Sequence, residues 1–523
     1  MRRFAPICMG LSLLSAGCGD VFVPPGANFE YTEKREPCAD RNAFRNLYFG
    51  DLHAHTGLSF DAWAYGNHAT PDQAYLFARG EDSMELAAAD GNEARVAAMK
   101  RPLDFVALSD HSEFLGELNL CLTEGSPVYD EPICAEYRQG DMGNVVKFGS
   151  QLAMEEPERL PGICDTGKAD CLEAARKVWA GVVASADKAY DRTAACRFTA
   201  FAGYEYTNST NVTNLHRNVI FRNDSVPDLP ITYFEQPSPW GLLEDLDSKC
   251  VEAGTGCDVI SIPHNSNWSN GMLFRLDYDG NDDPATQKRM AELRARMEPI
   301  VEIFQHKGDM ECDSTLEGLG GEPDHLCDWE KQRFQPFDQC MGEPGFGGVS
   351  RLGCVSRLDF VRNVLKAGIG EEVRIGANPY RLGIIGSTDT HNATPGFVDE
   401  TDFKGHVGTT DDTAIKRLGP GNMTHHGVVY NPGGLAAVWA VENSRDAIFE
   451  AMRRREVYGT SGPRIEVRMF GGWDLPADSC ERDDLVKTGY RLGVPMGGVL
   501  PTRGPDAASP VMVVRAVADI TSL

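Results

Sequence analysis

Short apolar runs alternate with longer amphipathic stretches along most of this chain. The apolar runs have the length and bounding residues of buried strands, whereas the amphipathic stretches repeat their apolar positions at helical spacing. Strands that alternate with helices are typical of a parallel α/β fold. The predicted helices span 170–190, 284–297 and 356–366, and the predicted strands are the runs LYFGDL, DFVALSD, FTAFAGYEY, DVISIPH, PIVEIFQH and LGIIGSTDTH.

Nearly every apolar run ends in side chains of the metal-binding type. In a parallel barrel the strand ends of one polarity converge on one face, so residues far apart in sequence meet in one site. The pattern therefore predicts an α/β fold, a TIM-like β/α barrel with long loop insertions, and one pocket at its strand ends. The residues at these ends are His53, His55, Asp110, His111, Glu205, His264, His306, Asp389 and His391.

Four segments follow from the pattern. Residues 1–18 contain two arginines, an apolar run too short to span a bilayer, and small residues before Cys18, as in an exported protein. LLSAGC resembles the bacterial lipobox, which predicts a lipoprotein signal peptide; a plain secretory signal is the alternative. Residues 19–45 are predicted to be a tether, 46–462 the barrel domain, and 463–523 a small strand-rich appendage.

Charge and cysteine content restrict the possible binding partners and the cellular location of the protein. The formal net charge of −27 repels nucleic acid and anionic membrane surfaces, so we expect neither a nucleic-acid partner nor a membrane contact other than a lipid on Cys18. Among the 15 cysteines no C-x-x-C pair occurs. In an exported chain, disulfides that hold long loops are therefore expected, with a connectivity that the sequence leaves open. The predicted location is the cell envelope, as an outer-membrane lipoprotein that faces the periplasm or the cell surface.

The spacing of the polar residues favours a metal centre. His53 and His55 alternate on a strand and so share one face, where two imidazoles can chelate one divalent cation. Asp61 lies on the following loop, and Asp389 with His391 ends a later strand. Asp110 is either a ligand or a group that orients its neighbours.

YFGDLHAHTGLSFDAW and REVYGTSGPRI resemble a branch of uncharacterised bacterial proteins in the polymerase and histidinol phosphatase (PHP) superfamily. The resemblance covers residues 47–464 and implies a distorted seven-unit β/α barrel with two or three divalent metal ions, Zn, Mn or Fe. It implies that His53, His55 and Asp389 bind one ion, that Glu205 bridges to a second held by His264 and His306, and that Asp61, His111 and His391 hold a third. Asp61 stands where many relatives have histidine. Glu302 is an alternative to His306.

Such a cluster implies a metal-dependent hydrolase, and the relatives imply a phosphate ester as its small-molecule substrate. Charge on the reacting phosphoryl group would need cations, for which Arg217, Lys307, Arg275 and Arg464 are the candidates. Asp110, Glu205, Arg217 and Arg464 are the predicted catalytic residues.

His216 either faces the site or is an ordinary hydrogen-bonded histidine. SNWSNGM (266–272) offers an indole and amides that are suited to a substrate, or to ordinary turns. The pocket would accept a nucleotide, a sugar phosphate, a phospholipid head group or a phosphonate equally well.

Two other functions stay open. An amidohydrolase acting on a C–N or lactone bond uses similar barrel-end histidines, but Glu205 occupies the place of its usual carboxylated lysine. A binding protein with purely structural metals would have no chemical reason to retain every ligand position. A serine hydrolase and a P-loop nucleotidase are disfavoured, because neither G-x-S-x-G nor a complete G-x-x-x-x-G-K-[ST] motif occurs; GICDTGK (162–168) is followed by Ala169.

Overall fold

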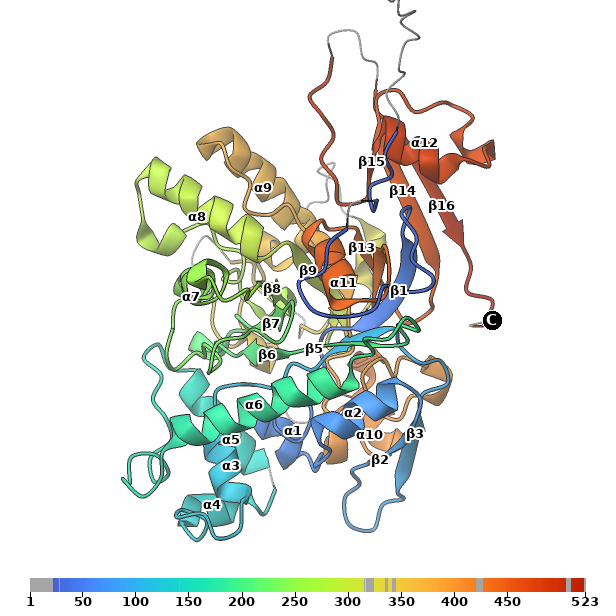
Figure 1. Ribbon diagram of the computed structural model, residues 1–523. Coiled ribbons are helices and arrows are strands. Elements are labelled where there is room, and N and C mark those ends of the chain that lie inside the picture. The colour runs from blue at the N-terminus through green and yellow to red at the C-terminus, as the bar shows by residue number, and fades with distance from the viewer. Residues whose placement is uncertain are drawn as a thin grey trace, which may run out of the picture.

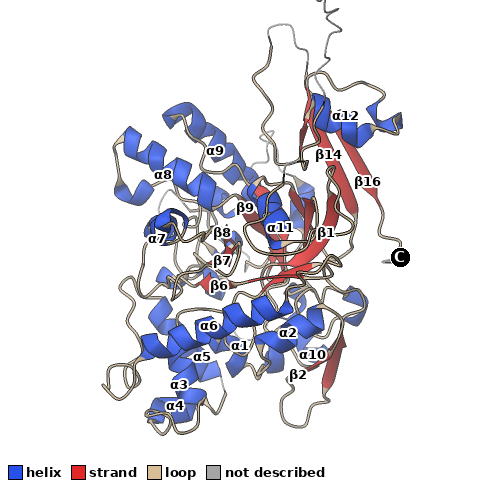
Figure 2. Cartoon of the chain, in the orientation of Figure 1, coloured by secondary structure: helices blue, strands red, loops and turns tan. Residues whose placement is uncertain are grey.

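The computed structural model describes residues 22–521 except 28, 141, 315, 317–323, 334–336, 341–344, 420–426 and 505–508. Residues 1–21, with the predicted signal peptide and Cys18, lie outside the described part. Helices lie around the strands in the middle of the molecule, and the strands of the C-terminal segment lie at one edge (Figures 1 and 2). Among the described residues, no helix has both the length and the apolar character that crossing a bilayer requires.

The largest sheet has five strands in the order β13-β12-β1-β4-β5. β1, β4 and β5 run parallel, whereas β12 is antiparallel to both of its neighbours. Every residue of β4, β5 and β12 is buried, which fits a sheet covered on both faces. The strands are β1 (Asn46–Asp51), β4 (Phe105–Ala107), β5 (Thr199–Phe201), β12 (Leu435–Ala440) and β13 (Val457–Thr460).

Two three-stranded sheets adjoin it. In one, β9 pairs parallel with β11 and antiparallel with β10; in the other, β6, β7 and β8 form an antiparallel meander. The sequence predicts parallel strands throughout, so the meander and β12 depart from that prediction; the closed seven-unit barrel stays a prediction. The strands are β6 (Gly203–Tyr206), β7 (Arg217–Phe221), β8 (Val259–Pro263), β9 (Ile300–Gln305), β10 (Gly308–Asp309) and β11 (Gly383–Gly386); β2 (Ser83–Leu86) and β3 (Arg95–Ala98) form a separate hairpin.

The long helices confirm the amphipathic pattern. α6 begins after Asp170, whose carboxylate accepts hydrogen bonds from the backbone N–H groups of Leu172 and Glu173 and so caps the helix. α8 has the predicted bounds, and α9 extends nine residues beyond the predicted 366. The helices are α1 (Phe60–Ala64), α2 (Pro71–Ala78), α3 (Leu115–Leu122), α4 (Pro132–Tyr137), α5 (Met142–Leu152), α6 (Cys171–Ala189), α7 (Pro239–Lys249), α8 (Pro284–Met297), α9 (Val361–Ile375), α10 (Ala414–Leu418), α11 (Arg445–Arg453) and α12 (Leu485–Leu492).

The described part of the predicted tether packs on the folded body. The Tyr31 hydroxyl donates to Oε2 of Glu442 at 2.8 Å, and the backbone N–H of Thr32 donates to Oδ2 of Asp446 at 2.9 Å. A disulfide joins Cys38 to Cys196. This stretch therefore does not behave as a free linker.

The C-terminal segment forms a sheet of its own in the order β15-β14-β16, with α12 packed on it (Figure 1). Phe470 is its most buried apolar side chain, and the Trp439 indole N–H donates to the carbonyl of Val467 at 3.0 Å, which ties this sheet to β12. The strands are β14 (Glu466–Gly472), β15 (Val494–Pro495) and β16 (Val511–Val517).

Disulfides confirm the prediction from cysteine content. Five of them join cysteines that are neighbours along the chain and close loops of 7 to 15 residues, whereas Cys38–Cys196 spans 158 residues. Cys480 is free and exposed. Six disulfides indicate that the chain matures in an oxidising, extracytoplasmic compartment. The short-range pairs are Cys121–Cys134, Cys164–Cys171, Cys250–Cys257, Cys312–Cys327 and Cys340–Cys354.

Candidate metal centre

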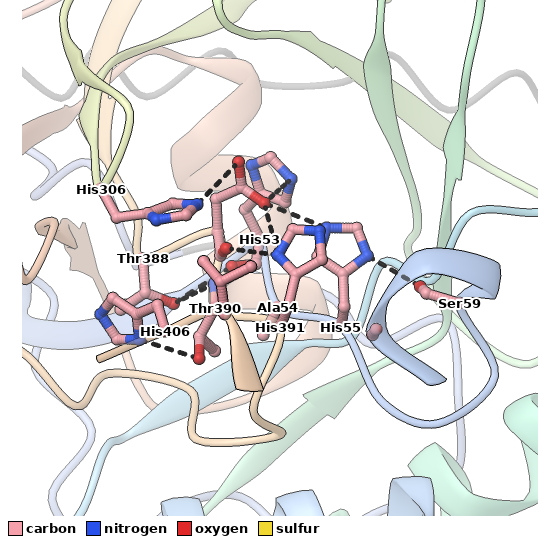
Figure 3. A network of polar contacts seen from close by, with 12 residues as sticks. His53, Ala54, His55, Ser59, His306, Thr388, Thr390, His391 and His406 are labelled. Atoms are coloured by element: carbon pink, nitrogen blue, oxygen red, sulfur yellow. Dashed lines mark hydrogen bonds and ion pairs between the residues drawn. The ribbon is translucent and has the colours of Figure 1, made fainter. Parts of the chain in front are cut away.

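Backbone pairing beyond the strand ends brings the polar residues together. The segments that follow β1 and β11 run side by side: Asp389 N–H donates to the carbonyl of His53 at 2.8 Å, and His55 N–H donates to that of Thr390 at 2.8 Å. A parallel bridge likewise joins His111 to Glu205. The structure therefore brings these strand ends together. Figure 3 shows His53, His55 and His391 facing one another.

The Glu205 carboxylate lies at the centre of this cluster. Its Oε1 lies 2.6 Å from Nδ1 of His216 and 3.0 Å from Nε2 of His264. Its Oε2 lies 3.3 Å from Nε2 of His55 and 3.4 Å from both Nε2 of His53 and Nδ1 of His111. All these side chains are buried except His216, which is 12% exposed. One carboxylate thus faces five imidazoles.

Asp389 forms a second acidic centre. Its Oδ1 lies 3.3 Å from Nε2 of His53 and 3.1 Å from Nε2 of His55, whereas its Oδ2 accepts from Gln305 and Lys307. Asp389 has a φ of 54°, a left-handed conformation that is uncommon for residues other than glycine. Such backbone strain persists where the surrounding structure holds it, often at functional sites.

Asp61 of α1 forms the third acidic group. Its Oδ2 lies 3.0 Å from Nε2 of His391 and 3.5 Å from Nε2 of His111. The His391 ring stacks on that of His55 with centroids 4.2 Å apart, so this group adjoins the Asp389 group. The structure thus brings together Asp61, His111 and His391, as the sequence resemblance implies.

The donor atoms fit divalent metal ions. Four sets of residues from this cluster have ligand atoms within 4.8 Å of one another: His53, His55 and Asp389; His53, Glu205 and His264; His111, Glu205 and His216; and His55, His111 and His391. Nε2 of His53 and Oε2 of Glu205 are buried and have no hydrogen-bond partner among the described residues. A bound cation would satisfy such atoms, and imidazole with carboxylate suits Zn, Mn or Fe.

A second layer of polar groups orients two of the imidazoles. Oε2 of Glu302 lies 3.0 Å from Nδ1 of His53. The Ser59 hydroxyl donates to Asp110 at 2.8 Å, so it accepts from Nδ1 of His55, which lies 2.8 Å away. Both arrangements place the Nδ1 proton outward and leave the Nε2 lone pair for a cation. Asp110 therefore orients His55 through Ser59, and Glu302 orients His53.

Burial and neighbouring charges shift the pKa values of the carboxyl groups in the cluster in opposite directions. Burial raises the pKa of the Glu205 carboxyl, but the adjoining imidazoles of His111 and His264 outweigh it and hold the pKa well below its usual range. Burial likewise raises the pKa of Asp389, and His53 with Lys307 reverses that shift. These carboxylates are therefore ionised at neutral pH and ready to bind cations.

His306 lies away from the place that the sequence resemblance implies for it, and His216 lies in that place instead. His306 does not reach Glu205; its Nε2 lies 3.6 Å from Oδ2 of Asp389, on the far side of the cluster from Ser59 (Figure 3). His216 takes the predicted place of His306 beside His264. The signal for His216 is its position in LHRNVIFR directly before β7, which pairs with the strand that carries Glu205.

The predicted arginines lie elsewhere. Arg217 is buried and its Nε lies 2.6 Å from Oε1 of Glu298, on the face of β7 that points away from Glu205. Arg464 donates to the backbone carbonyls of Arg101 and Pro102. Arg275 is 45% exposed and its Nε lies 3.4 Å from Asp277. The structure gives none of the three a contact with the cluster; only Lys307 among the predicted cations reaches it.

The fold and the site together define a mixed α/β protein with a buried histidine and carboxylate centre that can hold metal ions. The chain belongs to the family described as "Protein of unknown function (DUF3604)", whose model matches residues 42–523. No curated protein matches the chain.

A crystal structure from Bacteroides vulgatus is a weak match. It is described as a two-domain protein containing a predicted PHP-like metal-dependent phosphoesterase. It is 11% identical, with a TM-score of 0.30, and the match covers 82% of this chain and 69% of that one. At this level of likeness, neither its fold nor its function carries over to this chain.

Proposed function

We propose that the protein is a metal-dependent hydrolase, and more particularly a phosphoesterase that acts on a small-molecule phosphate ester. The observation that carries the proposal is the Glu205 carboxylate, whose two oxygens face five imidazoles in separate ligand sets. A carboxylate shared in this way is suited to bridge two cations. The resemblance of the strand-end motifs to the PHP superfamily supports the phosphoester specificity.

Divalent cations held here would lower the pKa of a water molecule and stabilise negative charge on a phosphoryl group. The protein's own groups prepare the site for that chemistry. Glu302 and Asp110 orient His53 and His55, and burial excludes bulk water, which strengthens the electrostatic interactions within the cluster. Lys307 supplies positive charge beside Asp389.

The test starts from the chain that begins at residue 22, expressed under disulfide-forming conditions. Metal content is measured by elemental analysis, and hydrolysis of p-nitrophenyl phosphate and bis(p-nitrophenyl) phosphate is followed with added Mn or Zn. We expect two or three metal ions per chain and metal-dependent release of nitrophenol. Bound metal without phosphoester turnover would instead favour an amidohydrolase, and a chain without metal would contradict the proposal.

A pair of double variants makes the test specific. His53→Ala with His55→Ala should lose both metal and hydrolysis, because each imidazole faces Glu205 and Asp389. His68→Ala with His325→Ala removes two exposed histidines and should change neither. Full activity in the first variant would refute the proposed site.

We also propose that the protein is a lipoprotein of the cell envelope, anchored through Cys18. The six disulfides support an extracytoplasmic compartment, and the lipobox resemblance supports the anchor. Radiolabelled palmitate should enter the full-length protein in a bacterial host, and Cys18→Ser should abolish the labelling. A wild-type protein that takes up no label would contradict the anchor.

A further inference from the structure

A second group of polar side chains lies on the Asp389 side of the cluster, where the Glu205 ligand sets do not reach. Gln305, His306 and Lys307 are consecutive at the end of β9, and the His306 N–H donates to the carbonyl of Thr388 at 3.2 Å. This pairing places the three side chains beside Asp389. None of them belongs to the metal-ligand sets centred on Glu205.

Gln305 holds this group in place. Its amide nitrogen donates both to Oδ2 of Asp389 and, at 2.7 Å, to Oδ1 of Asn265, and its oxygen accepts from the backbone N–H of Lys307. All the polar atoms of Gln305 are therefore satisfied. Because Oδ1 of Asn265 faces Gln305, Nδ2 of Asn265 points elsewhere, and this buried donor has no hydrogen-bond partner among the described residues.

His306 adds a further unpaired nitrogen. Its side chain is fully buried; within the described part of the chain Nδ1 has no hydrogen-bond partner, whereas Nε2 faces Oδ2 of Asp389 at 3.6 Å. Its ring meets that of Tyr430 edge-on, with centroids 4.8 Å apart. Buried polar atoms of this kind call for a partner that the protein does not supply, such as water or a ligand.

Lys307 brings a positive charge to the same place. Its ammonium contacts Asp389, and its side chain is 17% exposed, whereas the His53, His55 and His306 side chains around Asp389 are 1% exposed or less. A lysine on a flexible stem at the edge of a buried cluster can turn its ammonium toward an incoming anion.

We propose that Lys307, His306 and Asn265 form a subsite that binds the anionic oxygens of a phosphomonoester dianion next to Asp389. This subsite proposal rests on the proposed phosphoesterase function and names the class of substrate for that function. The cluster contains three carboxylates, Asp61, Glu205 and Asp389, with those of Asp110 and Glu302 behind them. Three divalent cations together with Lys307 exceed the charge of all five carboxylates and leave an excess of positive charge. A dianionic monoester compensates that excess better than a monoanionic diester.

The first test is binding of inorganic phosphate to the metal-loaded protein, measured by titration calorimetry, with the metal content of each sample determined in parallel. Lys307→Gln and His306→Gln should each weaken phosphate binding about tenfold or more, because a charge-assisted hydrogen bond contributes more than one factor of ten. Neither should change the metal content. Lys100→Gln, which removes an exposed lysine from an ion pair with Asp399, is the matched control.

Three results would overturn the subsite: no phosphate binding by the wild-type protein, wild-type affinity in both variants, or loss of metal from His306→Gln, which would make His306 a ligand. The second test compares kcat/KM for p-nitrophenyl phosphate and for its bis diester. Lys307→Gln should lower the monoester value about tenfold more than the diester value. Equal losses on both substrates would exclude the dianion specificity.

The two proposals fail in different ways. If the wild-type protein holds metal but hydrolyses neither ester, the phosphoesterase function fails while the phosphate titration still decides the subsite. If it hydrolyses both esters and phosphate binding is the same in every variant, the function stands and the subsite fails.

Discussion

Oε2 of Glu302 lies 3.0 Å from Nδ1 of His53, with both side chains buried. The contact fixes the imidazole so that Nε2 faces Glu205 and Asp389. It also explains why Glu302, which the sequence left open as a ligand, belongs to the layer behind the ligands.

This relationship predicts that Glu302→Gln weakens metal binding without abolishing it. The amide cannot accept as strongly from the imidazole N–H, and loss of such an outer partner costs about 10–100-fold in metal affinity. Competition titration with a chromogenic chelator measures the affinity. Glu311→Gln, at a 46% exposed side chain paired with Arg362, is the control. Equal affinity in the two variants would contradict the role given to Glu302.

His216 is expected to act as a metal ligand. His216→Ala removes a nitrogen that lies 2.6 Å from Oε1 of Glu205, so the protein should lose about one metal equivalent, or bind it at least about tenfold more weakly. Elemental analysis after dialysis against a defined metal concentration gives the count. The exposed His325 provides the control, as His325→Ala. If His216→Ala keeps its full metal content, another residue must be the metal ligand beside His264.

The local sequence pattern predicted those site residues that lie at the end of a strand. His53, His55 and Asp389 follow apolar runs, Glu205 lies near the end of another, and parallel backbone pairing brings these positions together. The helices 170–190 and 284–297 were equally predictable from the sequence, because helical periodicity and helix caps are local features.

The positions of His216 and Arg217 depended on strand direction, which the hydrophobic pattern of the sequence does not reveal. Because β7 is antiparallel to β6, its beginning meets the end of β6, which brings His216 to Glu205. The register pairs Arg217 with Tyr206 and Asn218 with Glu205. Cross-strand partners share a face, so Arg217 points away from the site and pairs with Glu298. A parallel interpretation cannot yield either result.

The long-range disulfide should be a major source of stability. Cys38–Cys196 closes a loop of 158 residues and fastens the N-terminal segment beside Glu442. Replacing both cysteines with serine should lower the free energy of unfolding by about 2–5 kcal/mol. Urea denaturation followed by tryptophan fluorescence measures the change. Cys480→Ser, at the exposed free thiol, should leave the curve in place. An unchanged midpoint in the double variant would show that the N-terminal contacts suffice.

His406 should give the protein part of its pH dependence. Its ring is buried between Thr390 and Pro432, with Nδ1 2.9 Å from the Thr390 hydroxyl oxygen and Nε2 2.8 Å from the Pro432 carbonyl oxygen. Burial lowers the pKa of His406 from 6.5 to about 4. The unfolded chain therefore takes up a proton as the pH falls through 6.5, while the folded protein does not.

Because the unfolded chain binds this proton at higher pH than the folded protein, the free energy of unfolding falls as the pH is lowered. The stabilising contribution of neutral His406 is complete above pH 6.5 and is lost progressively as the pH falls toward about 4, at about 1.4 kcal/mol per pH unit. His406→Gln should remove this slope, although it lowers stability at neutral pH. Urea denaturation between about pH 4 and 7, in EDTA so that metal binding does not contribute, measures it. The exposed His325→Gln variant should keep the wild-type slope. If the His406→Gln curve runs parallel to that of the wild type, His406 is already protonated in the folded protein, and burial does not control its charge.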